Sequence, residues 1–268
     1  MIHVVTAANR SLYEPQLLQM HRQRTEIFVK GRGWSLKVAE NGGEYDEGDD
    51  ERALYFLALG RAGDIERSIR VRPTDDWCLL ADVFPQFVGP DVPSVRNPDV
   101  WEMARYYATG AAGEEDGLGR SGELRLAMME KAARSGIARI VGLGDLALME
   151  AVIRTGRSLR ALGPPGHYPE GEGIAVEIVV SPAALDAIRK RLTYRGTSIL
   201  ELAPGDALAE IGPKAAEVLL DASRRLGPGS LERVTRLMRA IARIEAASGS
   251  EAAIRAIERA GAAMGLDG

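Results

Sequence analysis

The sequence predicts a mixed α/β fold followed by an all-helical extension. Strand-like and helix-like segments alternate up to about residue 200, which indicates a sheet with helices packed on it. Tyr194 is the last aromatic residue, and the residues after it are mainly Ala, Gly, Leu, Ile, Glu and Arg. This change in composition, together with Pro204-Gly205, divides the chain into a main domain, residues 1–204, and a helical extension, residues 205–268.

The main domain begins with a strand, a long helix, a loop and a hairpin. Asn9 can cap the first helix, along which apolar residues recur at helical spacing. Residues 32–52 are polar, acidic and glycine-rich, and we expect a loop or a mobile flap there. Two strand-like runs then flank Ala62-Gly63, and glycine tolerates the positive φ of a hairpin turn. Proline-rich residues 85–99 form a connection.

The remaining elements follow from β-branched runs and from amphipathic spacing. The expected strands are residues 2–7, 54–61, 64–72, 100–108, 137–143, 158–162 and 173–180. The expected helices of the main domain are residues 9–31, 122–135 and 145–156, and one that Pro182 opens in its first turn.

Three amphipathic helices are expected in the extension. The first runs from Pro213 to Leu226, and Ser230 and Ser250 cap the second and third. Each must bury an apolar face, and we expect packing on the main domain or on one another. A homodimer contact or a carrier-protein contact through this extension is the alternative.

Composition excludes several classes of protein. Hydrophobic residues make up 46% and charged residues 27%, as in a globular protein, and a net charge of −4 gives no basic excess for nucleic acid. No apolar run is long enough to span a membrane, and the N-terminus lacks a signal-peptide pattern. The single cysteine, Cys78, allows no intrachain disulfide, so we expect a cytoplasmic protein. Three scattered histidines have no metal-ligand spacing, and we expect no metal.

Five features occur in order within the first 105 residues. They are Arg24, Phe28 and Trp34 in RTEIFVKGRGW, Asp46 and Asp49 in EYDEGDD, Arg70 in IRVRPT, VFP at 83–85, and Glu102 and Arg105 in WEMAR. No single feature is specific, but the ordered set resembles the acyl-homoserine-lactone synthase (autoinducer synthase) family over about residues 2–200. The resemblance implies a GNAT-like mixed twisted sheet flanked by helices, which agrees with the expected order of elements.

The resemblance also implies a reaction. Enzymes of this family transfer an acyl group from an acyl carrier protein or coenzyme A to the amine of S-adenosylmethionine. The methionine carboxylate then attacks its own γ-carbon, 5′-methylthioadenosine leaves, and an acyl-homoserine lactone, a quorum-sensing signal, remains. S-Adenosylmethionine is a substrate here, and no cofactor is expected.

The residue types fit this chemistry. Carboxylates suit the ammonium and sulfonium of S-adenosylmethionine, a guanidinium suits its carboxylate, and an aromatic face suits the sulfonium through cation–π attraction. The resemblance implies that Arg24, Phe28, Trp34, Asp46 and Asp49 bind S-adenosylmethionine, and that Arg70, Glu102 and Arg105 act in catalysis. Glu102 is the candidate base for the amine, directly or through a water, and a backbone N–H beside splayed strands is the candidate oxyanion donor.

Each residue also has a structural interpretation. Arg24 fits a surface charge, Phe28 fits the core, and Asp46 and Asp49 fit a solvated acidic loop. Arg70, Glu102 and Arg105 fit an ion-pair network within the sheet, and we expect such a network to orient the residues that touch substrate. Glu102 and Arg105 lie an odd number of residues apart, so on a regular strand they face opposite sides. Either a bulge intervenes or the two have different surroundings.

Two glycine patterns resemble nucleotide-binding loops. Gly117 to Gly122 spells GxGxxG, and Gly142 to Ala147 spells GxGxxA, but neither is followed by the acid that a dinucleotide fold needs. We reject that fold and instead assign Gly117, Gly119 and Arg120 to a phosphopantetheine phosphate at a helix N-terminus. An ordinary flexible turn is the alternative.

The chain departs from the family pattern on the acyl side. Arg67 stands where the family usually has a small residue, and Ala104 replaces a common serine. Residues 138–150, which in the family help to line the acyl pocket, have no aromatic side chain here. The type of acyl group therefore stays open between longer, branched and unusual chains. Two other functions compete with the lactone synthase. One is an N-acyltransferase for a different amine, and the other is a non-catalytic S-adenosylmethionine-binding descendant.

Overall fold

The chain divides into two compact units, Met1–Glu201 and Leu202–Gly268. The computed structural model describes residues 1–60, 63–109, 119–146, 159–206, 208–209 and 212–226. The first unit is a mixed sheet flanked by helices, which confirms the expected α/β class. The second contains helix α6, Pro213–Leu226, with the bounds expected from the sequence. The helices predicted after Ser230 and Ser250 lie outside the described residues.

The sheet has the strand order β6-β8-β5-β4-β3-β2-β1-β9, with β7 paired to β8. β4 pairs with β5 in parallel, as does β1 with β9, and the other pairs are antiparallel. The strands are β1 Ile2–Val5, β2 Leu54–Leu59, β3 Ile65–Pro73, β4 Val100–Ala108, β5 Arg139–Asp145, β6 Leu159–Ala161, β7 Gly166–Tyr168, β8 Gly171–Val179 and β9 Ile199–Leu200. Seven of these match expected strands; β7 and β9 were not expected, because they are too short to show alternation.

The first helix expected from the sequence is a continuous helical segment in which three types of helix follow one another. A 3₁₀-helix, η1 (Ala7–Tyr13), leads into α1 (Glu14–Arg24) and a π-helix, η2 (Thr25–Gly31). The prediction that Asn9 caps it is wrong, because the N-cap is Thr6. Asn9 lies inside the first turn, where its side chain accepts the Thr6 N–H at 2.8 Å and donates to the Val4 carbonyl at 3.1 Å.

The other helices are α2 Leu79–Asp82, η3 Pro85–Phe87, α3 Gly119–Arg134 and α5 Pro182–Leu192. Pro182 does open α5, and the Ser181 hydroxyl caps it by accepting the Ala184 N–H at 3.2 Å. The helix expected at 145–156 falls almost entirely outside the described residues, and β5 extends to Asp145.

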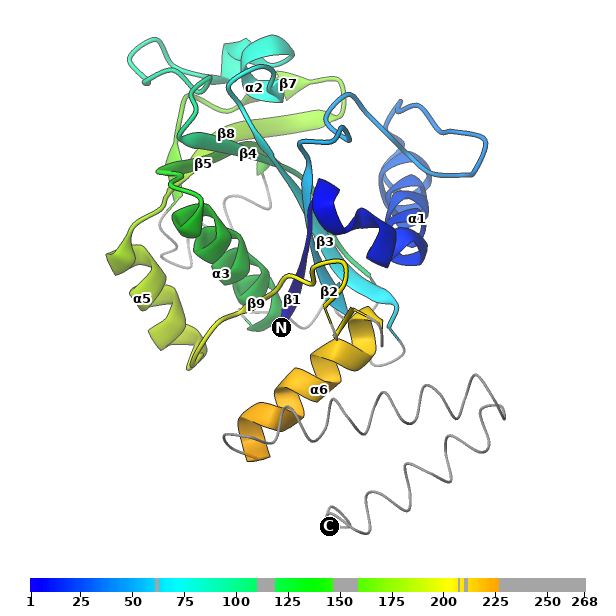
Figure 1. Ribbon diagram of the computed structural model, residues 1–268. Helices are drawn as coiled ribbons and strands as arrows, with labels where there is room; N and C mark the ends of the chain where they lie inside the picture. The colour runs from blue at the N-terminus through cyan, green and yellow to red at the C-terminus, as the bar shows by residue number, and fades with distance from the viewer. Residues whose placement is uncertain (61–62, 110–118, 147–158, 207, 210–211, 227–268) are drawn as a thin grey trace. The chain divides into compact units, whose positions relative to one another are not determined.

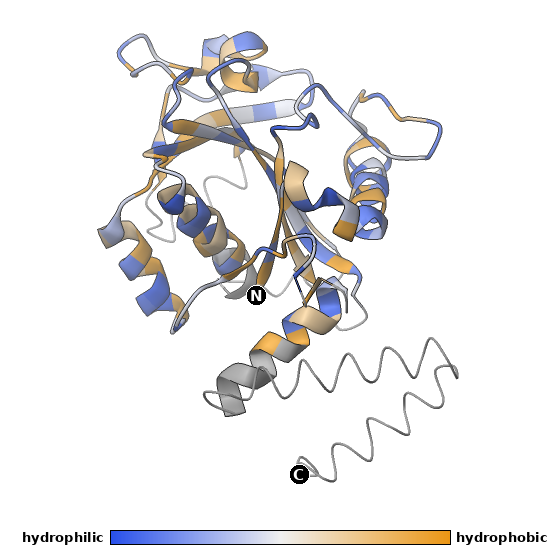
Figure 2. Cartoon of the chain, in the orientation of Figure 1, coloured by the Kyte–Doolittle hydropathy of each residue, from blue (hydrophilic) through white to orange (hydrophobic). Residues whose placement is uncertain are grey.

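Helices cover both faces of the sheet: α3 and α5 lie on one side and α1 on the other (Figure 1). Colouring by hydropathy shows that the strands and the helices of the first unit carry both apolar and polar residues (Figure 2). Along β3 the residues alternate, so Ile69 and Val71 join the core beneath α3, and Arg70 and Arg72 point to the opposite face. The face toward α1 therefore carries buried arginines.

A bulge interrupts β4. Arg70 pairs with Ala104 but Ser68 pairs with Tyr107, so Arg105 and Tyr106 together oppose Ile69. Arg105 has a φ of 55°, a left-handed conformation that is uncommon for a residue with a side chain. The bulge answers the question of spacing left by the sequence, because it turns Arg105 toward the face that Glu102 occupies.

β4 and β5 pair only over Val100–Glu102 and Arg139–Val141, and they separate beyond that point. Gly142 stands at the separation, where a Cβ atom would lie 2.7 Å from the Met103 carbonyl oxygen. The second glycine pattern thus has a packing role, since only glycine lets the two backbones approach this closely.

We expect Gly142→Ala to destabilise the fold by about 1–3 kcal/mol, because the added carbon meets backbone that cannot rotate away. Calorimetry should show a lower Tm than for Val179→Thr, a control at an exposed β8 position that keeps a β-branched side chain. Equal Tm values for the two variants would contradict this packing role.

Candidate active site

Arg70 of β3 is the centre of a buried ion network. Its side chain is 3% exposed, and its Nη1 and Nη2 both contact the Asp46 carboxylate, the latter at 3.1 Å. Nη1 also lies 3.0 Å from Asp49 Oδ1. Gly48 allows this approach, because a Cβ atom there would lie 2.6 Å from Arg70 Nη2.

The segment 44–50 supplies the carboxylates, and it is a braced turn. Asp49 Oδ2 accepts the Asp46 N–H at 2.9 Å, and Asp46 Oδ1 accepts the Gly48 N–H at 2.8 Å. The Asp49 N–H donates to the Asp46 carbonyl at 3.0 Å. Asp46 and Asp49 thus belong to a buried structure, and the solvated-loop interpretation is wrong for both.

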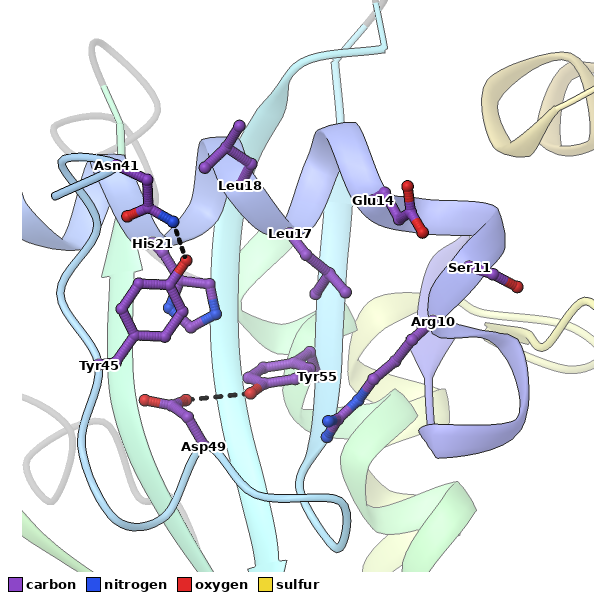
Figure 3. A pocket seen from close by; sticks show the side chains of 10 residues that line it. All are labelled: Arg10, Ser11, Glu14, Leu17, Leu18, His21, Asn41, Tyr45, Asp49 and Tyr55. Atoms are coloured by element: carbon purple, nitrogen blue, oxygen red, sulfur yellow. Dashed lines mark hydrogen bonds between the residues drawn. The ribbon is translucent and has the colours of Figure 1, made fainter. Parts of the chain in front are cut away.

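Arg24 of α1 joins the network from the side. Its Nη1 and Nη2 donate to the two oxygens of Asp49 at 2.8 and 2.9 Å, and its Nε donates to Glu44 Oε2 at 2.5 Å. The side chain is only 1% exposed, so Arg24 is not a surface charge. Tyr55 of β2 donates its hydroxyl to Asp49 Oδ1 at 3.0 Å (Figure 3).

Arg105 reaches the same carboxylates from the β4 bulge. Its Nη2 lies 2.9 Å from Glu44 Oε1 and 2.8 Å from Asp46 Oδ2. Three arginines and three acids therefore share one network: Arg24, Arg70, Arg105, Glu44, Asp46 and Asp49.

A stacked pair of aromatic rings adjoins the network through Phe28. Phe28 and Trp34 stack with centroids 4.9 Å apart and planes 15° apart, and Arg105 Cζ lies 6.0 Å from the Phe28 ring centroid. Phe28 is buried and Trp34 is partly exposed. Phe28 thus belongs to the core and also supports the more open tryptophan face.

Glu102 lies on the same face of the sheet but in different surroundings. Its carboxylate accepts the Leu79 N–H at 2.7 Å and the Leu80 N–H at 2.8 Å, at the start of α2. The side chain is buried, and this burial raises the pKa of Glu102 to about 7, although the two N–H donors oppose the shift. Glu102 can therefore exchange a proton near neutral pH.

The network acids behave in the opposite way. Burial alone would raise the pKa of Asp49 and Asp46, but it is outweighed by Arg70, helped by Arg24 at Asp49 and by Arg105 at Asp46. The pKa values of both carboxyls are lowered, and both stay ionised. The protein thus holds one carboxyl ready to take a proton beside others that keep their charge.

The predicted residues Arg24, Asp46, Asp49, Arg70 and Arg105 come together, with Phe28 beside Arg105 and Trp34 stacked on Phe28. Gly117 lies outside the described residues, and Gly119 and Arg120 begin α3, where their side chains are not described. Sequence reasoning missed Glu44, which is fully buried, and Arg72, which binds Asp50 and Asp76. Arg72 shares the face of Arg70 by alternation, whereas nothing distinguishes Glu44 from exposed Glu47 and Glu51.

A cleft of about 430 Å³ lies between α1 and the segment 41–55 (Figure 3). Asp49 and Tyr55 form part of its wall, together with His21 and Tyr45, and neither Phe28 nor Trp34 lines it. Across the described ranges, no cluster of His, Cys, Asp and Glu could hold a metal ion. None of the helices traced in these ranges is long and apolar enough to cross a membrane.

Comparison with known proteins points to one family. The autoinducer synthase family model matches residues 9–188. The isovaleryl-homoserine lactone synthase of Bradyrhizobium diazoefficiens is 30% identical over 194 residues, which cover 72% of this chain and 85% of that protein. The acyl-homoserine-lactone synthase of Ralstonia nicotianae is 30% identical over 144 residues, 53% of this chain and 71% of that protein.

Solved structures give the same answer. The CoA-dependent acyl-homoserine lactone synthase BjaI, with MTA, superposes with a TM-score of 0.67 at 28% identity, covering 79% of this chain and 99% of that one. The CoA-dependent synthase MesI gives a TM-score of 0.64 at 30% identity, with 74% and 98% covered. The chain belongs to the autoinducer synthase family, and it is an enzyme of the acyl-homoserine-lactone synthase type.

Proposed function

We propose that the protein makes an N-acyl-homoserine lactone from S-adenosylmethionine and an acyl thioester, and that the buried ion network binds the amino-acid end of S-adenosylmethionine. One observation carries this assignment. Arg105 and Asp46 are paired and are the most exposed members of the network, at 12% and 13%, whereas its other four side chains are at most 3% exposed. A cation and an anion at the open end of a neutral cluster match an α-carboxylate and an α-ammonium.

The aromatic pair supplies the site for the sulfonium. Trp34 presents a partly exposed ring, and Phe28 fixes that ring by stacking on it. Cation–π attraction contributes about 0.5–2 kcal/mol at such a face. Because Phe28 also lies beside Arg105, the sulfonium and the carboxylate of one methionine chain can bind together.

The proposed reaction needs one base and one alignment. Glu102 accepts the amine proton, directly or through a water, and the amine nitrogen attacks the thioester carbonyl while the thiolate leaves. A backbone N–H beside the separating ends of β4 and β5 steadies the oxyanion. The methionine carboxylate then attacks the γ-carbon, the carbon–sulfur bond breaks, and its electrons pass to the sulfur of 5′-methylthioadenosine.

We propose coenzyme A as the acyl carrier, because BjaI and MesI are described as CoA-dependent. Because one relative is an isovaleryl-homoserine lactone synthase, branched acyl groups are the first class of substrate to test. For the phosphopantetheine phosphate we propose Gly117, Gly119 and Arg120, because α3 begins at Gly119 and a helix N-terminus attracts anions.

The purified protein with S-adenosylmethionine and isovaleryl-CoA should release 5′-methylthioadenosine and free thiol in equal amounts, with a lactone detected by mass spectrometry. A parallel panel offers other acyl-CoA substrates and the same acyl groups on a carrier protein. Acylation without 5′-methylthioadenosine would favour an acyltransferase for another amine, and no turnover on either carrier would favour a non-catalytic binding protein.

Glu102→Gln should lower kcat by about 10²–10⁴-fold, because the amine loses its base. In the wild type, kcat should fall as pH drops below about 7, since a carboxyl with this raised pKa is protonated there and cannot accept a proton. This inflection should be absent from the variant's profile. A variant that retains both the rate and the inflection would remove Glu102 from the role of base.

Trp34→Ala should raise the KM for S-adenosylmethionine by about 2–30-fold, the range that corresponds to loss of a cation–π contact. Trp34→Phe should retain most of the affinity, because an aromatic face remains. An unchanged KM in the alanine variant would place the sulfonium elsewhere. The KM for acyl-CoA serves as the internal control.

A further inference from the structure

Glu44 joins two arginines that come from opposite sides of the site. Its carboxylate is completely buried. One oxygen accepts a hydrogen bond from Arg24 Nε of α1, and the other accepts one from Arg105 Nη2 of the β4 bulge. A buried carboxylate is stable in this position because both oxygens are held by cations.

The backbone of Glu44 is fixed by α1. Its N–H donates to the His21 carbonyl at 3.0 Å, and its carbonyl lies 2.9 Å from His21 Nδ1. The next residue, Tyr45, stacks on the His21 ring with centroids 3.9 Å apart (Figure 3). Burial and the neighbouring Arg24 lower the pKa of His21 to about 4, so above pH 5 the ring is neutral and its Nδ1–H donates to this carbonyl.

Arg105 needs an anchor of this kind. Its left-handed φ directs the side chain out of the strand, toward the segment 44–46. Asp46, its other carboxylate partner, is shared with Arg70 and is partly exposed. Glu44 is the partner that cannot move, because α1 holds its main chain and Arg24 holds its side chain.

We propose that Glu44 is a positioning residue for S-adenosylmethionine: it does not touch the substrate, and it fixes the Arg105 guanidinium where the substrate carboxylate binds. This proposal rests on the proposed function. It gives the fully buried acid of the loop a role in substrate affinity beyond its role in folding.

The first test measures S-adenosylmethionine affinity of Glu44→Gln by calorimetry. The amide keeps the shape but loses the charge that holds Arg105, and the dissociation constant should rise about tenfold or more. The KM for acyl-CoA should stay within about twofold. Glu47→Gln, at an exposed position of the same loop, is the matched control and should bind like the wild type. A lower Tm with unchanged affinity would show a structural role only and overturn the proposal.

The second test is a double-mutant cycle with Arg105→Lys. If Glu44 acts through Arg105, Glu44→Gln should raise the dissociation constant less than about threefold in the lysine background. Independent effects that multiply would overturn the proposal. Should Glu44→Gln fail to fold, Glu44→Asp keeps the charge and should fold with intermediate affinity; loss of the folded state in both variants would assign Glu44 to structure alone.

The failure of the proposed function has a different signature. A wild-type protein that neither binds S-adenosylmethionine nor releases 5′-methylthioadenosine would remove the function itself. A wild type that does both, beside a Glu44→Gln variant of equal affinity, would remove only the role of Glu44.

Discussion

Charge neutrality inside a desolvated space governs this site. Arg24, Arg70 and Arg105 come from a helix and two strands, and their three acidic partners come from one turn of chain. A buried charge is costly when its partner is absent, so each ion holds the others in place. The turn that contains Glu44, Asp46 and Asp49 is made mainly of polar residues. Its own hydrogen bonds and its ion pairs with the arginines hold it in place, where other segments are held by apolar packing.

The β4 bulge is the second constraint, because it converts a strand residue into a site residue. Without the extra residue, Arg105 would follow Trp101 and Met103 toward the core beneath α3. A left-handed φ at an arginine is unfavourable by itself, and such conformations persist where the surroundings fix them. The contacts with Glu44 and Asp46 supply that fixation, so the bulge and the ion network stabilise each other.

Much of the architecture could be predicted because alternation and turn chemistry are local. The hairpin β2–β3, strand β4 and helix α6 have bounds close to those that the spacing indicates. Strands β7 and β9 are short and depend on pairing with distant residues, and the Asn9 cap was wrong because Thr6 begins the helix earlier. In the site, the resemblance to the family singled out Asp46 and Asp49 as candidates, but no local pattern separates buried Glu44 from exposed Glu47. Burial of a loop carboxylate is decided by arginines far away in sequence.

Two different environments on one face of the sheet shift the pKa values of the carboxyls in opposite directions. Asp46 and Asp49 lie against guanidinium groups and stay ionised, whereas Glu102 is buried and accepts two backbone N–H groups, and burial raises its pKa to about 7. Environments that separate the pKa values of neighbouring acids are how one site binds a cation and also takes up a proton. Because Glu102 lies on β4 only three positions before the bulge, the strand that carries the proposed base also carries the arginine proposed to hold the substrate. In the proposed reaction the backbone of β4 then sets the distance between Glu102 and the bound substrate, and pairing with β3 and β5 fixes that backbone.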